Sequence, residues 1–347
     1  MTRVLPAMAG APVGGAETFF TRLAVALQRA GLDQRLVIRP DPVREAALQG
    51  AGIEIATARF GGRLDMTTRR RFRRLIAEWR PDLVLTWMNR ATAFCPRAGT
   101  AGTPRFVHVA TPRGYYGPKY YRNCDHLIVT TDDLVRFYAD AGWPEGRLTR
   151  IPNFVPDTPA EAAPRSAFAT PRAAPLLLAL GRLHVNKGFD VLLDAAAALP
   201  RHHLWIGGIG PEERALKRQA ESLGIAGRVR FLGWQPDIAP LFAAADAFIC
   251  SSRHEPFGNI VVEAWAHRTP VVAVAAEGPG SLIRDGVDGL LVPVDDADAL
   301  ASAIRRLETE KGLAEALASG GRAAFEAGHT EAIVVGRYLA LFEELAG

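Results

Sequence analysis

The sequence predicts an α/β protein built from two doubly wound domains, each with a parallel sheet. Short apolar runs with strand character alternate with amphipathic helical patterns, as expected when parallel strands are joined by helices. The alternation stops once, in a stretch rich in Pro and Ala at residues 156–175, and then begins again. The length of 347 residues exceeds one ordinary hydrophobic core and fits two domains of roughly 150 to 190 residues each.

In the first half, a Gly-rich loop at residues 10–17 separates the first expected strand from the first helical pattern. Such a loop lets a phosphate or an acceptor come close to the backbone, although a Gly pair is also a common turn device. Strands are expected at 2–8, 83–87, 105–109 and 126–130, and helices at 18–29 and 132–142.

The second half repeats the pattern after residue 175. Strands are expected at 176–180, 203–207, 228–233 and 247–250, and helices at 189–199, 259–267 and about 330–345. The acidic run 295–298 is typical of a helix start, because carboxylates are favoured at helix N-termini.

Composition excludes several classes of protein. Hydrophobic residues make up 48% of the chain, which indicates a globular protein, and no apolar run reaches the roughly 18 residues of a membrane span. The N-terminus lacks the pattern of a signal peptide. The three cysteines are widely spaced without a C-x-x-C pair, which favours a reducing cytoplasm and gives no metal cluster. We therefore expect a cytoplasmic protein.

The net charge of +4 does not by itself indicate a nucleic-acid binder. Of the 41 basic residues only four are Lys, and the remaining 37 (41 − 4) are Arg, scattered along the chain. The signatures of RNA-binding and helix-turn-helix domains are absent, so we expect no nucleic-acid partner.

One basic cluster stands out at residues 69–74, where Arg69, Arg70, Arg71, Arg73 and Arg74 are interleaved with apolar residues at helical spacing. It is either a surface helix with a charged outer face or a helix that docks on an anionic membrane surface. In the second case each basic residue would contribute about 1 kcal/mol.

The stretch 255–263 places two carboxylates eight positions apart at the start of a helix. The strand 247–250 and the turn 251–256 precede it, so free backbone N–H groups are expected at the carboxyl end of a strand. Gly258 would let an anion approach, while Glu255 and Glu263 could accept hydrogen bonds from hydroxyl groups. The pattern suits a ligand that combines phosphate with polyol, although Glu263 alone could be a solvated residue on a helix face.

Arg182 and Lys187 lie five residues apart in a loop that Gly residues bound, after the strand 176–180. Arg grips phosphate oxygens with two hydrogen bonds and Lys acts as a point charge. We expect this loop to bind phosphate rather than to carry ordinary surface charge.

Two further candidates lie in the first half. His108 is expected at the carboxyl end of the strand 105–109, where a reacting group would belong, although a single His on a strand is often a core residue. The loop 111–121 holds four of the six tyrosines, including Tyr115, and aromatic faces with polar tips suit sugar stacking. A packed loop explains the tyrosines equally well.

The stretch 255–263 resembles the E-x7-E motif of the retaining nucleotide-sugar glycosyltransferases of family 4, which have the GT-B fold. Further segments are similar to that family: the Gly-Gly-x-Glu loop at 14–17, 151–155, the Gly-Arg-x5-Lys-Gly loop at 181–188, 270–273 and 285–293. One departure is Gly280-Ser281, where the family usually has a Glu.

The resemblance implies two Rossmann-like domains facing a central cleft. The first would span 1–155 and the second 176–329, with a hinge-like linker at 156–175 and a helix at 330–347 crossing back to the first domain. Arg182 and Lys187 would neutralise the leaving diphosphate, Glu255 would hold the sugar and Glu263 the ribose. His108 would lie near the reacting carbon of the sugar. Other binding residues would be Gly14, Gly15, Leu232, Phe257, Gly258, Asn259 and Ile260, together with Tyr115.

The expected function is therefore retaining transfer of a sugar from a nucleotide diphosphate sugar to a glycan or lipid-linked acceptor. No metal or other cofactor is expected, because the cations take the place of a metal. Residues 87–91 and the Tyr-rich loop resemble members that build lipopolysaccharide core or surface polysaccharide, which suggests a peripheral position on the inner face of the cytoplasmic membrane. The alternatives are a GT-B enzyme acting on a small soluble sugar, a non-catalytic nucleotide-sugar-binding protein, and a nucleic-acid binder.

Overall fold

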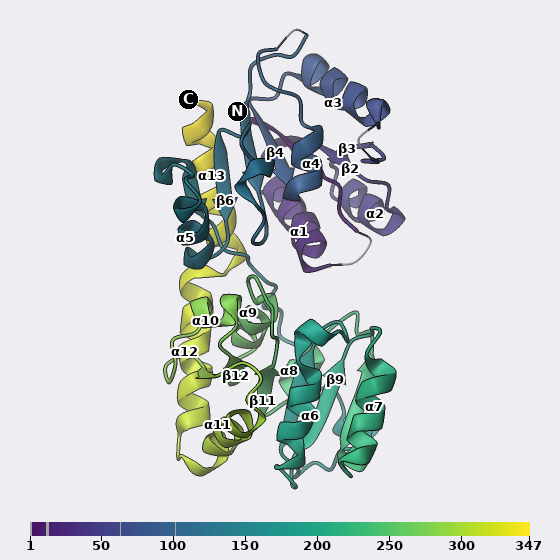
Figure 1. Cartoon of the computed structure of the whole chain (residues 1–347), viewed down its shortest axis with the longest axis vertical. Coiled ribbons are helices and arrows are strands. Elements are labelled where there is room, and N and C mark those ends of the chain that lie inside the picture. Colours follow the sequence, from purple (N-terminus) through teal and green to yellow (C-terminus); the bar gives the residue numbers. More distant parts are fainter. Residues whose placement is uncertain (1, 12–13, 63, 101) are drawn as a thin grey trace. The chain divides into compact units, whose positions relative to one another are not determined.

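A computed structural model describes residues 2–11, 14–62, 64–100 and 102–347, and the chain forms two compact units (Figure 1). The first unit contains Met1–Phe154 and Glu331–Gly347, and the second contains Val155–Thr330. Pro12 and Val13, in the expected Gly-rich loop, lie outside the described residues. The second unit is thus a continuous stretch of chain inserted into the first.

The first unit holds a parallel sheet whose strand order, within the described residues, is β3-β2-β1-β4-β5-β6-β7. The strands are β1 (Arg3–Met8), β2 (Asp33–Ile38), β3 (Glu54–Thr57), β4 (Leu83–Trp87), β5 (Val107–Thr111), β6 (His126–Val129) and β7 (Leu148–Arg150). The helices are α1 (Gly15–Arg29), α2 (Pro42–Gly50), α3 (Met66–Trp79), α4 (Met88–Phe94), α5 (Asp132–Asp140) and α13 (Glu331–Ala346).

Helices cover both faces of this sheet. α1 and α13 pack on one face, where Phe19 and Leu23 of α1 share a buried cluster with Tyr338 and Phe342 of α13. α3 and α4 cover the other face with side chains such as Phe72. Strand order reverses between β1 and β4, which makes their carboxyl ends the switch point of a doubly wound sheet.

The second unit has the parallel order β10-β9-β8-β11-β12-β13 in the part of the chain that is described. The strands are β8 (Leu176–Leu180), β9 (His203–Gly207), β10 (Val229–Gly233), β11 (Ala247–Cys250), β12 (Val271–Val274) and β13 (Leu290–Val292). The helices are α6 (Phe189–Ala197), α7 (Glu213–Ser222), α8 (Ala239–Ala244), α9 (Asn259–Ala266), α10 (Glu277–Leu282), α11 (Ala297–Thr309) and α12 (Leu313–Gly328). Here the order reverses between β8 and β11.

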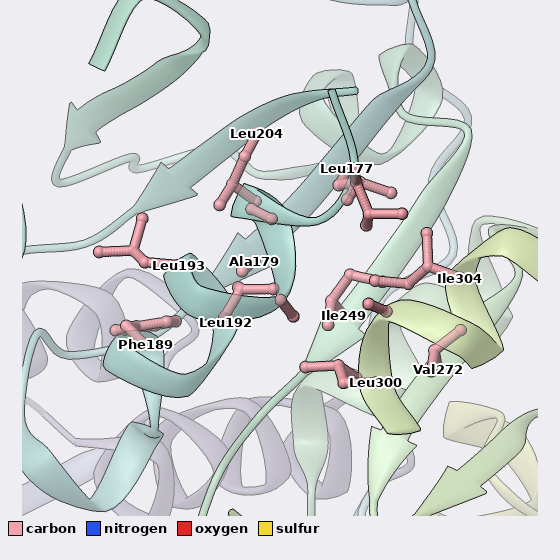
Figure 2. Close-up of a cluster of buried hydrophobic side chains, with 14 of the residues drawn as sticks. Leu177, Ala179, Phe189, Leu192, Leu193, Leu204, Ile249, Val272, Leu300 and Ile304 are labelled. Atoms are coloured by element: carbon pink, nitrogen blue, oxygen red, sulfur yellow. The ribbon is translucent and has the colours of Figure 1, made fainter. Parts of the chain in front are cut away.

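A cluster of buried hydrophobic side chains joins the sheet of the second unit to its helices (Figure 2). Strand residues such as Leu177 and Ile249 meet Leu192 of α6 and Leu300 of α11 there. Each fully buried aliphatic side chain contributes roughly 1.5–3 kcal/mol. The packed core therefore holds the strand ends, and the loops that leave from them, in fixed positions.

The structure differs from the sequence expectation in the segment 156–175. This segment belongs to the second unit, where Arg165 Nη2 donates to the carbonyl of Ala244 at 2.7 Å and Trp205 Nε1 donates to Thr170 Oγ1 at 2.9 Å. The Pro- and Ala-rich composition hides these contacts, so the stretch is packed rather than a free hinge. The expected helix start at 295–298 is present, since Asp296 caps α11.

Candidate functional site

The loops after β8 and β11 meet at the switch point of the second sheet. β8 and β11 are neighbouring parallel strands, so the loops 181–188 and 251–258 both leave from their carboxyl ends. Open α/β sheets bind ligands in the crevice outside such a switch point. Arg182 and Lys187 lie in the first loop, and Glu255, Phe257 and Gly258 in the second.

Hydrogen bonds to backbone carbonyls hold the two loops together. Ser251 Oγ donates to the carbonyl of Lys187 at 2.8 Å, and the N–H of Arg253 donates to the carbonyl of Asn186 at 2.8 Å. The guanidinium of Arg253 also donates to the carbonyl of Val185 at 2.7 Å and pairs with Asp190. The position of the ammonium of Lys187 relative to the second loop is therefore fixed by several bonds rather than by one.

Gly188 is required at the end of the first loop. Its φ of 60° lies in the left-handed region, and a Cβ there would come 2.1 Å from the carbonyl oxygen of Ser251. Only Gly lets the two backbones approach this closely. The same close approach is what places Lys187 over the end of β11.

Lys187 and Glu255 form an ion pair across the switch point, and both side chains are largely buried. Burial acts to lower the pKa of Lys187, but the Glu255 carboxylate outweighs it and the pKa lies above the ordinary Lys value. The ammonium is therefore protonated throughout the neutral range. An ammonium has three donors, so two remain for a ligand while Glu255 accepts the third.

Arg182 is exposed in the same loop as Lys187, and its guanidinium makes no ion pair or hydrogen bond within the described chain. The loop after β8 thus carries two cations, one of them paired with Glu255. Arg and Lys are the side chains that bind polyanions through charge and hydrogen bonds.

α9 begins directly at the switch point. Gly258 precedes it with a φ of 92°, in the left-handed region, and Phe257 is buried in the core of the second unit. Asn259 and Ile260 form the first turn of α9. The backbone N–H groups of a helix's first turn lack partners within the helix and favour an anion. Glu263 follows one turn later and is half-buried.

Glu277 is a neighbour of this site that the sequence did not single out. Its Oε1 lies 2.7 Å from Nδ1 of His254, and its Oε2 accepts the N–H of Glu255 at 3.3 Å. Burial acts to raise the pKa of Glu277, but hydrogen bonds from backbone N–H groups and from His254 lower it below the ordinary value. The carboxylate therefore stays ionised and fixes the turn that carries Glu255. No spacing rule connects residues 22 positions apart, so only the fold reveals the contact.

The sequence also singled out Leu232 and Ser281 in the second unit. Both are distant in sequence from Arg182 and Lys187. Leu232 is in the edge strand β10, and its carbonyl accepts Gln235 Nε2 at 2.7 Å. Ser281, where the resembled family usually has Glu, lies in α10.

In the first unit, the described residues of the Gly-rich loop lie against the carboxylate of Glu17. Glu17 Oε1 accepts the N–H of Ala11 at 2.9 Å, and a Cβ on Gly14 would come 2.2 Å from Glu17 Oε2. Arg44 also holds Ala11 in place, because its Nη2 donates to the carbonyl of Ala11 at 2.8 Å. Gly14 and Gly15 thus begin α1 at the carboxyl side of β1, with Glu17 as the residue that shapes the loop.

The prediction for the location of His108 was wrong. β5 spans Val107–Thr111, so His108 lies near its amino end, and the carboxyl end leads to Arg113 instead. The ring is 4% exposed and its Nε2 lies 3.0 Å from Thr86 Oγ1. Burial lowers the pKa of His108 to about 4, so the ring is neutral at physiological pH. These are the properties of a core residue, and they do not bring the imidazole to a ligand.

Tyr115 packs against α5. Its hydroxyl donates to Asp133 Oδ2 at 2.5 Å, and its ring meets that of Phe137 edge-on at 5.2 Å. Tyr116 and Tyr120 are the more exposed tyrosines of the loop, at 37% and 44%. The structure therefore favours the packed interpretation for Tyr115.

The basic cluster lies on α3, whose apolar face is buried. Phe72, Ile76 and Trp79 pack in the first unit, whereas Arg70, Arg71, Arg73 and Arg74 are exposed. Leu64 and Met66, just before and at the start of α3, are 92% and 51% exposed. Among the helices of the described chain, none is long and apolar enough to cross a membrane.

Comparisons with known proteins agree with this architecture. Residues 14–153 match the family model described as glycosyl transferase 4-like domain, and residues 174–310 match that of glycosyl transferases group 1. The lipopolysaccharide core biosynthesis glycosyltransferases LpsE and LpsD of Rhizobium meliloti (strain 1021) are each 34% identical to this chain over 331 residues. The match to LpsE covers 94% of this chain and 95% of LpsE, and the match to LpsD covers 95% of both.

Among solved structures, HepE from Anabaena in complex with UDP superposes with a TM-score of 0.87 and 21% identity. The match covers 99% of this chain and 100% of HepE, and it supports the GT-B fold. Two doubly wound units, the matched models and the full-length relatives lead to one conclusion: the chain is a glycosyltransferase of the GT-B fold and belongs to the family of group 1 and 4-like glycosyl transferases.

Proposed function

We propose that this enzyme transfers a sugar, with retention of configuration, from a nucleotide diphosphate sugar to an acceptor of the lipopolysaccharide core. The observation that carries the proposal is the Lys187–Glu255 pair at the switch point of the second sheet, with Arg182 exposed in the same loop as Lys187. The names of LpsE and LpsD support the acceptor class, and the UDP complex of HepE supports the donor class.

The cations would act on the leaving group. As the bond between the sugar and the diphosphate breaks, negative charge develops on the diphosphate oxygens. Lys187 and Arg182 would stabilise that charge together with the first turn of α9, and this type of electrostatic stabilisation is usually the largest catalytic contribution. Because Lys187 is already held in place by Glu255, little reorganisation is needed when the donor binds.

The carboxylates would hold hydroxyl groups. In this proposal Glu255 binds the sugar and Glu263 binds the ribose. With retention, the acceptor attacks from the face from which the diphosphate departs, and a diphosphate oxygen takes the acceptor proton. No side chain is then needed as a base, which agrees with the buried and neutral state of His108.

We further propose that catalysis needs no metal, because Arg182 and Lys187 supply the positive charge. Transfer should then continue at an unchanged rate after dialysis against a chelator such as EDTA. A loss of activity that Mg²⁺ or Mn²⁺ restores would contradict this part.

The exposed arginines of α3 support a peripheral position on the inner face of the cytoplasmic membrane. Their charge complements anionic lipid headgroups, and Leu64 and Met66 offer apolar surface next to them. A lipid-linked acceptor would then be reached without a membrane-spanning segment.

The test of the proposed function is a thermal-shift screen with UDP-, GDP- and ADP-sugars. A ligand that binds only the folded state stabilises it by about 2.7 kcal/mol at 100 times its Kd. The enzyme should hydrolyse the best donor slowly when no acceptor is present. It should transfer the sugar of that donor rapidly to a lipopolysaccharide core acceptor. If no nucleotide sugar raised the melting temperature, the proposal would fail.

A further inference from the structure

Arg113 occupies the carboxyl end of β5, where the sequence had suggested His108. Its guanidinium carbon lies 4.9 Å from the centre of the Phe19 ring and 4.8 Å from that of Trp87. Phe19 belongs to α1 and Trp87 ends β4. Two aromatic contacts hold the planar group in one orientation, which a Lys side chain could not reproduce.

The hydrogen bonds of this guanidinium are incomplete. Nη2 donates to Asn153 Oδ1 at 2.5 Å. Nη1 is buried, and no hydrogen-bond partner for it exists among the described residues. A buried donor without an acceptor is costly, so one that persists at a strand end is informative.

The charge of Arg113 is also uncompensated. Three other half-buried arginines have carboxylate partners, namely Arg165 with Asp246, Arg253 with Asp190 and Arg322 with Asp157. Arg228, also half-buried, has none among the described residues, but its guanidinium donates to three backbone carbonyls. Within the described chain no carboxylate pairs with Arg113, and the only ionisable neighbour acting on it is Tyr338. Burial lowers the pKa of Arg113 to about 10, so the group stays charged at neutral pH.

Further features mark this edge of the sheet. Arg113 has a φ of 65°, a left-handed conformation that costs a non-Gly residue energy and that persists mainly at functional sites. Trp87 Nε1 and Thr111 Oγ1 are buried as well and lack partners among the residues described. Trp87 and Thr111 are paired in register at the ends of β4 and β5. The edge is therefore rich in unused hydrogen-bond donors and has a positive charge.

We propose that Arg113 binds an oxyanion of the acceptor, a phosphate or a carboxylate. This inference rests on the proposed function, because it assigns the anion to the acceptor of that reaction. Charge and donors at the end of β5 match an oxyanion, and Arg recognises such groups through two N–H bonds. The cations for the donor diphosphate, Arg182 and Lys187, belong to the second unit, whereas Arg113 belongs to the first.

The binding test uses inorganic phosphate after the donor site has been saturated with the nucleoside diphosphate that stabilises the protein most. Phosphate should then raise the melting temperature of the wild type further, compared with chloride at equal ionic strength. In Arg113→Gln the Kd for phosphate should rise about 10- to 100-fold, the loss expected for a hydrogen-bonded charge. The control is Arg147→Gln, an exposed arginine of the same unit with the same change in charge.

Steady-state kinetics separate the acceptor from the donor as the source of the anion. Arg113→Gln should raise the KM for a phosphorylated core acceptor about 10- to 100-fold and leave the KM for the donor unchanged. Removing the phosphate from the acceptor should raise the acceptor KM of the wild type but not that of Arg113→Gln. A raised donor KM with an unchanged acceptor KM would overturn the proposal.

If Arg113→Gln does not fold, the melting temperature of the wild type with and without added anion still tests the proposal. Absence of any effect of either phosphate or acetate on the melting temperature of the donor-saturated wild type would refute the anion site. Failure of the proposed function looks different, because it appears earlier, as the absence of stabilisation by every nucleotide sugar. The two failures are therefore distinguishable.

Discussion

Lys187 and Glu255 are ion-paired partners across the switch point of the second sheet. The sequence suggested separate tasks for them, with the cation on the diphosphate and the carboxylate on the sugar. The pair joins these tasks, because each side chain fixes the other before a ligand arrives. An anion that draws Lys187 toward itself would also change the hydrogen bonding of Glu255.

The first prediction concerns this pair. Lys187→Ala should lower kcat for transfer about 100-fold or more, because one preorganised donor to the leaving group is lost. The donor should still bind, since Arg182 and α9 remain. Lys217→Ala is the matched control, because Lys217 is an exposed lysine of the same unit paired with Glu213. Equal turnover of both variants would argue against the proposed role.

A second prediction separates the close approach at Gly188 from its backbone conformation. Gly188 and Gly224 both have positive φ, at 60° and 69°, but a Cβ on Gly224 would meet nothing within 4 Å. Gly224→Ala should cost about 1–2 kcal/mol of unfolding free energy. Gly188→Ala should cost about 1–3 kcal/mol more, because its methyl group strikes the Ser251 carbonyl. Denaturant titration measures both values, and activity should fall only in Gly188→Ala.

A third prediction follows from the buried His108. Its pKa of about 4 in the folded protein lies below the ordinary 6.5, so the unfolded chain binds the proton more readily between these values. The stability contribution is therefore complete above about pH 6.5 and is lost as the pH falls toward 4, by about 3 kcal/mol in all.

Unfolding measured between pH 7 and 4.5 checks this sign. His108→Gln should flatten the dependence of stability on pH, whatever its effect at pH 7. An unaltered slope in His108→Gln would mean that other groups cause the acid sensitivity.

The sequence predicted the positions of the loops 181–188 and 251–258 better than the end of the strand around His108. Arg182, Lys187 and Glu255 follow buried strands of four or five residues that end at Gly or Ser, so their location at a sheet edge was readable. The strand around His108 was placed two residues too early. Val109, Ala110 and Thr111 continue β5 without any turn signal, and alternation alone does not reveal where pairing stops.

Other features depend on tertiary contacts that no local pattern encodes. In the sequence, Arg113 is one of many scattered arginines. Only the structure shows that its guanidinium lies against the rings of Phe19 and Trp87. Glu277 lies in a Gly-rich segment without a recognisable motif, and only the fold places it next to His254, after β12. Both residues are recognisable only from their surroundings.

The last prediction concerns α3 and membranes. Arg70→Gln with Arg71→Gln should reduce binding to phosphatidylglycerol vesicles about 30-fold, because two exposed charges contribute roughly 2 kcal/mol together. Arg214→Gln with Arg218→Gln, two exposed arginines of the second unit, is the matched control. Co-sedimentation at low and high salt measures the effect, which salt should weaken. Equal binding by the two double variants would exclude α3 as the docking surface.

The division of the chain also has a consequence for biosynthesis. Val334, Tyr338 and Phe342 of α13 complete the core of the first unit, yet they are synthesised only after the whole of the inserted unit. The inserted unit, residues 155–330, is finished earlier and has every strand of its own sheet by then. Nascent chains should therefore acquire protease resistance in the reverse of the usual N-terminal-first order.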